Sequence, residues 1–128
     1  MTRDELVSKW KSLTPRERDA WISVVACGWE WTNYYGNDLL IPPPSDERIN
    51  WCATWEDGLP NWLPHYSTSS TAIGELVSTI DSYRFDKCIK RYYATVSNEN
   101  KVTVENSESK EAALCLAILI NKLCTEDE

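Results

Sequence analysis

The apolar run AALCLAILI, residues 112–120, constrains the fold more than any other part of the sequence. It belongs to a predicted helix over about residues 108–123, and its apolar side chains occupy every side of that helix. A helix that is apolar all round is covered on more than one side. The chain must therefore place other elements, or a second subunit, against both faces of its last helix.

Two capping boxes near the N-terminus predict two further helices. Thr2 and Thr14 are each followed three residues later by a glutamate, the pattern in which the two residues satisfy each other's backbone N–H groups. Pro15 suits a first helical position, and Gly28 suits the residue after a helix end. We expect helices over residues 3–12 and 15–27. The buried side of the second should carry Leu13, Trp21, Val24 and Val25.

The middle of the chain predicts two hairpins around a helix. WEWTNYY, the turn GND and the run LLI, which PPP must end, indicate the first hairpin, and CIKRYYATV, the turn NENK and VTV the second. Between them, the apolar spacing predicts a helix over about residues 68–83 with Ser67 as its N-cap. Residues 45–64 are irregular, with a short helix predicted in DERINWCATWEDG.

The element order is helix, hairpin, helix, hairpin, helix, which predicts an α+β fold. We expect an antiparallel sheet built from the two β-hairpins and flanked by helices, an α-β-α layered sandwich. With 128 residues the chain fits a single domain, 1–128, with a disordered acidic tail at about 125–128.

Charge and hydropathy restrict the partners. The formal net charge is −7, which argues against binding of polymeric nucleic acid, because neutralising phosphates requires a basic face. A small anion can still bind where positive groups converge. The sequence shows no signal-peptide core and no apolar run of membrane-spanning length, so we expect a cytoplasmic protein without a membrane contact.

Metal and cofactor chemistry has little support in the sequence. The five cysteines are widely spaced without a CxxC pair, which is typical of reduced thiols in a protein interior. With His65 as the one histidine, we expect no metal site and no cofactor.

Two short motifs carry a resemblance to a known family. The runs VACGWEW, residues 25–31, and WLPHYST, residues 62–68, resemble the phage ABA-sandwich domain over about Trp10 to Leu123. That family often has Pro-x-Tyr-Ser-Thr-Asp before its middle helix, and Pro64, Tyr66, Ser67 and Thr68 match this pattern. Ser69 replaces the family's aspartate, and Gly74 replaces a bulky aromatic residue.

The resemblance implies a function in countering bacterial immunity. Similar proteins, the Thoeris anti-defence sponges, sequester cyclic ADP-ribose isomers or cyclic oligonucleotides without cleaving them. They assemble as homo-oligomers with sites between protomers. The resemblance therefore implies a phage protein that acts in the host cytoplasm as a homo-oligomer, a dimer or a multiple of dimers.

The candidate ligand-binding residues follow from the chemistry of a nucleotide. Tryptophan rings stack on bases, and a hydroxyl-rich helix start offers donors to an anion. A structural reading competes, because such hydroxyl clusters mostly cap helices and at least one of two tryptophans on one strand face is core. The candidates are Trp29, Trp31, Trp62, His65, Tyr66, Ser67, Thr68, Ser69, Arg84 and Arg91.

Three other classes of function stay open, one of which is a phage structural or regulatory module without a ligand. An acidic protein–protein inhibitor of a host defence component, such as a nucleic-acid mimic, would dock through the loop tryptophans Trp51, Trp55 and Trp62. A cyclic nucleotide hydrolase is the weaker reading, because adjacency of His65 and Ser67 in sequence does not create catalytic geometry. We therefore expect no catalytic residues and no enzyme activity.

Overall fold

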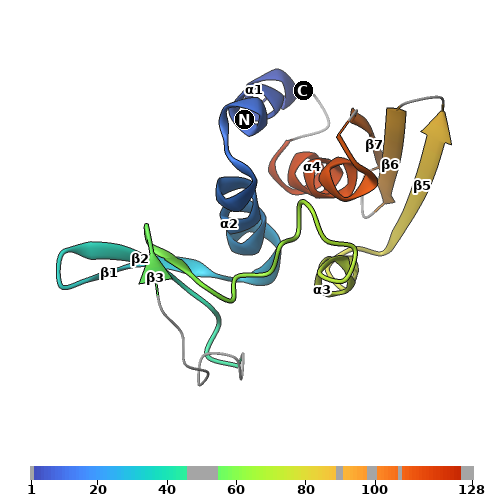
Figure 1. Cartoon of the computed structure of the whole chain (residues 1–128). Helices are drawn as coiled ribbons and strands as arrows, with labels where there is room; N and C mark the ends of the chain where they lie inside the picture. The colour runs from blue at the N-terminus through green and yellow to red at the C-terminus, as the bar shows by residue number, and fades with distance from the viewer. Residues whose placement is uncertain (1, 46–54, 89–90, 98–100, 107, 125–128) are drawn as a thin grey trace.

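The computed structural model describes residues 2–45, 55–88, 91–97, 101–106 and 108–124 (Figure 1). The helices are α1 (Arg3–Ser12), α2 (Pro15–Cys27), α3 (Ile73–Val77) and α4 (Lys110–Leu123). The strands are β1 (Glu30–Tyr34), β2 (Asn37–Ile41), β3 (Trp55–Glu56), β4 (Leu59–Pro60), β5 (Ser82–Cys88), β6 (Arg91–Ser97) and β7 (Lys101–Asn106).

The first two helices begin and end where their capping residues predict. The Thr2 hydroxyl accepts a hydrogen bond from the backbone N–H of Glu5, and Thr14 and Glu17 form the complete capping box of α2. Gly28 ends α2 with a φ of 78°, a left-handed conformation that favours glycine. Both N-terminal helices are confirmed.

The buried side of α2 differs from the prediction. Trp21, Val24 and Val25 are only half-buried, whereas Ala20 and Ile22 are buried. The two buried residues reach different clusters, because Ile22 packs into the main core and Ala20 into a second cluster with Trp29, Leu40 and Leu63. α2 therefore joins the two hydrophobic clusters that the described residues form.

The first hairpin forms as predicted, but its turn is shifted. β1 and β2 pair antiparallel with Tyr34 opposite Asn37, so the turn is Tyr35-Gly36 and not GND. Both turn residues have positive φ, 51° and 83°, as the tight turns that suit twisted hairpin strands require.

A second, short hairpin follows where a helix was predicted. β3 and β4 turn at Asp57 and Gly58, whose φ values are 53° and 83°. The prediction of a helix is thus wrong for residues 55–58 of DERINWCATWEDG. The remaining residues of that segment, 46–54, lie outside the described residues. The dipeptide Asp-Gly is itself a strong signal for such a turn.

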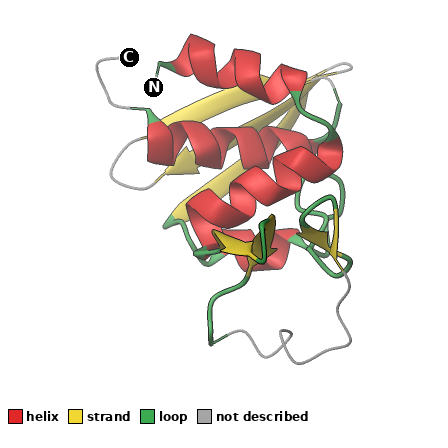
Figure 2. Ribbon diagram, turned by 90° about the vertical axis from the view of Figure 1, so that its left-hand side faces the viewer, coloured by secondary structure: helices red, strands yellow, loops and turns green. Residues whose placement is uncertain are grey.

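A separate three-stranded antiparallel sheet contains β5, β6 and β7, with β6 in the centre. The predicted second hairpin is formed by β6 and β7, whereas β5 was not expected. Ala94, Val96 and Val104 are buried with α4, and the other face carries polar residues, among them Thr95 and Thr103, whose hydroxyls lie 3.0 Å apart. This polar face explains why the described helices cover only one side of the sheet (Figure 2).

The apolar last helix lies between two layers of the same chain. α4 packs on β6 and β7 with one side and on α1 and α2 with the other (Figure 1). Each residue from 112 to 120 is buried. Its second apolar face therefore meets the N-terminal helices and needs no other subunit.

The fold class is α+β with antiparallel strands, as predicted. The two predicted hairpins lie in separate sheets and do not join into one, because the first packs on α2 and the loop after β4 instead of on α4. No helix in the described part of the chain has the length and apolar character that a membrane crossing requires.

The helix predicted over residues 68–83 is much shorter. α3 spans only Ile73–Val77, and no side chain caps its first turn. Its apolar face is confirmed, because Ile73, Leu76 and Ile80 are buried. Ser67 is not the N-cap, because its hydroxyl donates a hydrogen bond to Asp19 Oδ1.

Candidate functional site

An open groove of about 1020 Å³ separates α2 from the small hairpins. Its helical wall is formed by Glu17, Ala20, Trp21 and Val24, whose spacing places them on one face of α2, and by Leu13 just before that helix. The opposite side is lined by residues of the two small hairpins and of the loop after them: Trp31, Glu56, Asp57, Leu59, Pro60, Asn61 and His65. The volume is at the upper end of the roughly 300–1,000 Å³ that small-molecule sites occupy.

Two tryptophan rings lie in the walls of this groove. The Lys9 ammonium is 4.3 Å from the Trp21 ring centroid, so a cation already occupies one face of that ring. Trp31 is 50% exposed and offers the more open ring. Gly58 allows this placement, because a Cβ there would lie 3.1 Å from the Trp31 ring and 2.6 Å from the Asp38 carbonyl oxygen.

The charged groups of the groove are mixed. Lys9, Arg16 and His65 can donate hydrogen bonds, and Glu17, Glu56 and Asp57 are carboxylates. The Arg16 guanidinium is held in place by two bonds, to Asp19 Oδ2 at 2.8 Å and to the Leu63 carbonyl at 2.7 Å. Hydrogen bonds from the Thr14 backbone and hydroxyl lower the pKa of Glu17 below its usual 4.5.

This arrangement can hold a ligand that combines a flat ring with polar groups. An exposed indole face stacks on a base, worth about 1–3 kcal/mol per base. The cations can contact a phosphate, and the carboxylates can accept from sugar hydroxyls. A multiply charged anion would meet the three carboxylates, so the groove favours a ligand with few phosphates and many hydroxyls.

Of the ten predicted ligand residues, Trp31 and His65 line the groove. Trp29 is buried, and Trp62 packs against it with ring centroids 5.3 Å apart. These two rings form the second hydrophobic cluster with Leu40 and Leu63 and do not line the groove.

Tyr66 and Ser67 serve the interior of the molecule. Ser67 is buried, and both its backbone N–H (2.8 Å) and its hydroxyl (2.7 Å) donate to Asp19 Oδ1. The buried Tyr66 hydroxyl donates to Glu75 Oε2 at 2.9 Å, and burial raises the pKa of this phenol well above its usual value. The prediction that Ser67 starts a helix fails because a buried carboxylate of α2 is its partner.

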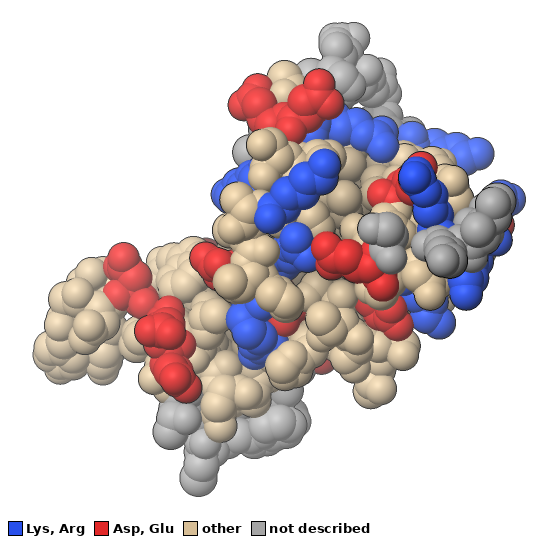
Figure 3. Space-filling model, turned by 45° about the horizontal axis from the view of Figure 1, so that its top comes forward, with Lys and Arg blue, Asp and Glu red and all other residues tan. Residues whose placement is uncertain are grey.

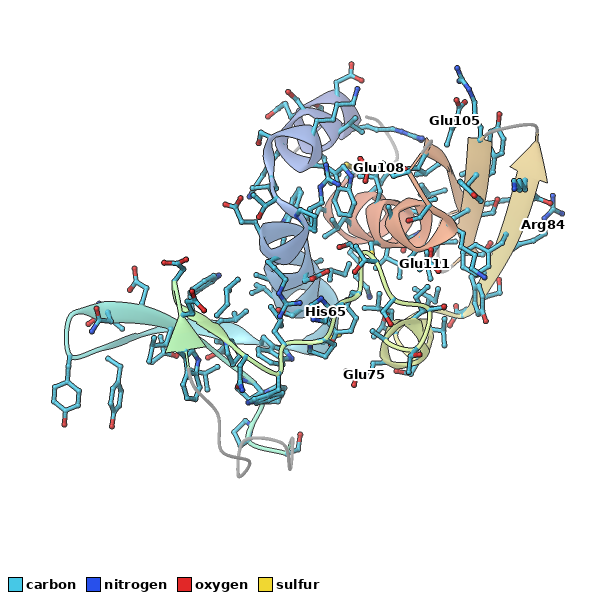
Figure 4. The ribbon with its side chains drawn as sticks, in the orientation of Figure 1. His65, Glu75, Arg84, Glu105, Glu108 and Glu111 are labelled. Carbon is cyan, nitrogen blue, oxygen red and sulfur yellow. The ribbon has the colours of Figure 1, made fainter. Side chains whose placement is uncertain are left out.

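The remaining predicted residues lie apart from one another. Thr68 and Ser69 donate their backbone N–H groups to the His65 carbonyl, which makes a local turn. Arg84 on β5 pairs with Asp86 at 2.9 Å, and Arg91 on β6 pairs with Glu105. Figure 4 shows Arg84 on the far edge of the sheet, away from His65. The two arginines therefore do not converge with the groove.

The tryptophans that were predicted to lie in loops offer less exposed ring surface to a partner protein than expected. Trp55 is half-buried in β3 and donates its ring N–H to the Leu40 carbonyl at 3.1 Å. Trp62 is half-buried against Trp29, and Trp51 lies outside the described residues.

The described thiols suit a structural role. Cys27, Cys115 and Cys124 are reduced, Cys115 is buried, and burial raises the pKa of its thiol. The Cys115 thiol donates to the Tyr66 carbonyl at 3.2 Å. Within the ranges that the structure describes, no three or more His, Cys, Asp or Glu side chains are grouped to hold a metal.

Sequence reasoning missed most of the groove. Lys9, Arg16 and Trp21 were not among the candidates, although the sequence predicts the two adjacent helices that carry them. The signal that was available is the Asp57-Gly58 dipeptide, since a hairpin there creates the opposite wall.

Comparison with known proteins gave no match: no family model fits the chain, and no curated protein and no solved structure is significantly similar to it.

Proposed function

We propose that this protein binds a small nucleotide-derived signal in the groove between α2 and the hairpins, and sequesters it without cleavage. The observation that carries the proposal is the open groove, which is lined by the half-exposed Trp31 on the hairpin side and by Lys9 of α1 and Arg16 of α2 on the helical side. The resemblance to the phage ABA-sandwich domain supports a ligand from the cyclic ADP-ribose isomers or the cyclic oligonucleotides. In this proposal the protein counters host immunity as a phage anti-defence protein.

In the proposed complex, different residues of the groove contact the base, the phosphate and the sugar of the ligand. Trp31 stacks on the base, Lys9 and His65 contact phosphate, and Arg16 is fixed by Asp19 so that little side-chain entropy is lost when it binds. Glu17, Glu56 and Asp57 accept from the sugar hydroxyls. The carboxylates therefore select against simple polyphosphates, and they limit how tightly an inorganic anion binds.

Sequestration demands a site that holds its ligand without reacting. A hydrolase would need a positioned base and nucleophile. Of the residues proposed for that reaction, Ser67 donates to Asp19, while His65 lines the groove. Ser67 is thus turned to the interior, which favours sequestration over hydrolysis.

The proposal includes the host cytoplasm as the place of action and assembly into a homo-oligomer in which each chain carries its own groove. Helix α4 no longer supports a homo-oligomer, because both of its faces are covered within the chain. Support for assembly now rests on the exposed aromatic residues of the first hairpin.

The central experiment titrates the protein with cyclic ADP-ribose isomers and cyclic di- and trinucleotides, and follows tryptophan fluorescence and melting temperature. We expect one of these to quench fluorescence and raise the melting temperature. Trp31→Ala should weaken that binding about tenfold or more, through lost stacking. Tyr34→Ala is the matched control, because Tyr34 is an exposed aromatic residue of the same strand outside the groove.

Recovery of the ligand distinguishes a sponge from an enzyme. After heat denaturation of the complex, mass spectrometry should find the added nucleotide intact. Cleaved product would show hydrolysis instead. If no nucleotide changes fluorescence or melting temperature, or if Trp31→Ala binds as well as the wild type, the proposal is wrong.

A further inference from the structure

The tip of the first hairpin carries a pair of unusually exposed rings. Tyr35 is 90% exposed and Tyr34 59%, and their centroids are 4.7 Å apart in an edge-to-face contact. The hairpin projects from the body of the molecule (Figure 1). Tyrosine is a residue on which interfaces commonly depend, because it buries a large area while losing little conformational freedom. The tip therefore has the character of an interface element.

The surroundings of this tip are acidic. Glu30, Asp38, Glu56 and Asp57 are exposed on the two small hairpins, and no lysine or arginine occurs in residues 28–45 or 55–64. Figure 3 shows acidic side chains along this projecting end. The tip thus fits a surface with exposed positive groups and polar hydrogen-bonding partners.

Such a surface lies on the same chain, at the opposite end of the molecule. The sheet face turned away from α4 has a hollow of about 360 Å³, lined among others by Arg84, Thr95, Lys101 and Thr103. On this face the described strands carry three cations, Arg84, Arg91 and Lys101, against the carboxylates Asp86 and Glu105, with which Arg84 and Arg91 pair. Lys101 is the cation that adds an excess of positive charge beside the hollow. Figure 3 shows basic side chains on this side of the molecule.

We propose that the Tyr34–Tyr35 tip of one copy docks in this hollow of a second copy. The phenol hydroxyls would bond to Arg84, Lys101 and the threonine hydroxyls, and the acidic flank would face the cations. Because the tip and the hollow lie at opposite ends, the contact is head-to-tail: each copy keeps one free tip and one free hollow, and chains or rings result. This inference rests on the proposed homo-oligomer and is independent of nucleotide binding.

The expected contact is weak and sensitive to salt. A tip of this size buries less surface than a stable interface needs, so association belongs to the micromolar range or weaker. Ionic attraction between the acidic hairpins and the cationic sheet is screened as salt rises. Light scattering should therefore show a mass above 14.7 kDa that grows with concentration and falls toward the monomer at high salt.

Two variants test the two surfaces separately. Tyr34→Thr/Tyr35→Asn removes the rings, and Asn suits the positive φ at position 35. Arg84→Gln/Lys101→Gln removes two cations of the hollow and leaves the strands intact. Each variant alone should weaken association about tenfold or more. Unchanged circular dichroism and a cooperative melt confirm that each variant is folded.

Mixing the two variants gives the decisive result. Each keeps one intact surface, so a head-to-tail contact predicts one-to-one heterodimers that stop at two copies. A symmetric contact would give no such rescue and would overturn the proposal. So would a wild-type protein that stays monomeric from about 1 μM to 1 mM at low salt, or a tip variant that associates like the wild type. If the tip instead captured a basic host protein, the wild type alone would be monomeric, again against the proposal.

Failure here can be told apart from failure of the proposed function. Neither variant changes a groove residue, so nucleotide titration of both should match the wild type. Association without nucleotide binding would sustain the contact and reject the ligand, and the reverse result would reject the contact alone.

Discussion

At the scale of single residues, one buried carboxylate organises the chain between β4 and α3. Asp19 is fully buried and accepts hydrogen bonds from Arg16 on its own helix and from Ser67 across 48 positions of sequence. Burying a carboxylate is costly unless it is paired and hydrogen-bonded, and these partners meet that requirement. The hydroxyl-rich segment is thus anchored to α2.

Ser67→Ala should destabilise the protein by about 1.5–3 kcal/mol, because it removes a hydrogen bond to a buried charged group. Urea denaturation measures the change. A double-mutant cycle with Asp19→Ala should show that the two effects are not additive. Ser70→Ala, at an exposed position of the same run, should change stability little. Additive effects of the first pair would contradict the assigned contact.

Glu17 gives the stability a dependence on acid. Because hydrogen bonds from Thr14 lower its pKa in the folded state, the stabilisation is fully present above the usual 4.5 and is lost as pH falls through the lowered value. Glu17→Gln should therefore destabilise the protein near neutral pH and change its stability less on acidification below 4.5. Denaturation curves at several pH values test this. Parallel pH profiles of both proteins would refute it.

At the scale of elements, helix α3 is held by packing more than by its own sequence. It has five residues, lacks a side-chain cap and contains Gly74, yet Ile73 and Leu76 are buried. Short helices are marginal in isolation, and most of their stability in proteins comes from burying one face. The apolar spacing therefore identified the packed face correctly, although the helix is shorter than that spacing implied.

Gly74→Ala should stabilise the protein by up to about 1 kcal/mol, because alanine loses less conformational freedom in a helix. An added Cβ at this position meets no atom within 4 Å. Thermal melts measure the gain. Gly28→Ala is the control in the opposite direction, since Gly28 has a φ of 78° and any side chain there is strained. A destabilising Gly74→Ala would mean that the helix is not formed as described.

At the scale of the whole molecule, α4 holds the layers together. It is the element that contacts the sheet and also α1 and α2, and its residues 112–120 are all buried. The hairpin end depends on a smaller cluster of four buried residues around Trp29. The helical end of the molecule is thus more extensively packed than the hairpin end, and the groove lies between the two.

Leu119→Ala should lower the free energy of unfolding by about 2–5 kcal/mol, because a fully buried leucine is replaced by a cavity. Leu39→Ala, a half-buried leucine of β2, is the matched control and should cost clearly less. Chemical denaturation of the two variants gives the comparison. Equal losses would show that α4 is not the central element of the core.

The parts that the sequence determined are those fixed by nearby residues. The ends of α2 depend on nearby residues, Thr14 and Glu17 at its start and Gly28 at its end. A helix that is apolar all round likewise predicts that both of its faces are covered. These signals act over a few residues, so they predicted α1, α2, the first hairpin and the burial of α4.

Only the tertiary structure decided which partners those elements meet. The second face of α4 packs on the chain's own helices, and Ser67 meets Asp19 from a distant part of the sequence. The groove likewise combines a helix face with a hairpin turn, two features that no local pattern connects. The physical reason is that burial and hydrogen bonding reward any complementary neighbour, and which neighbour arrives depends on how the whole chain closes.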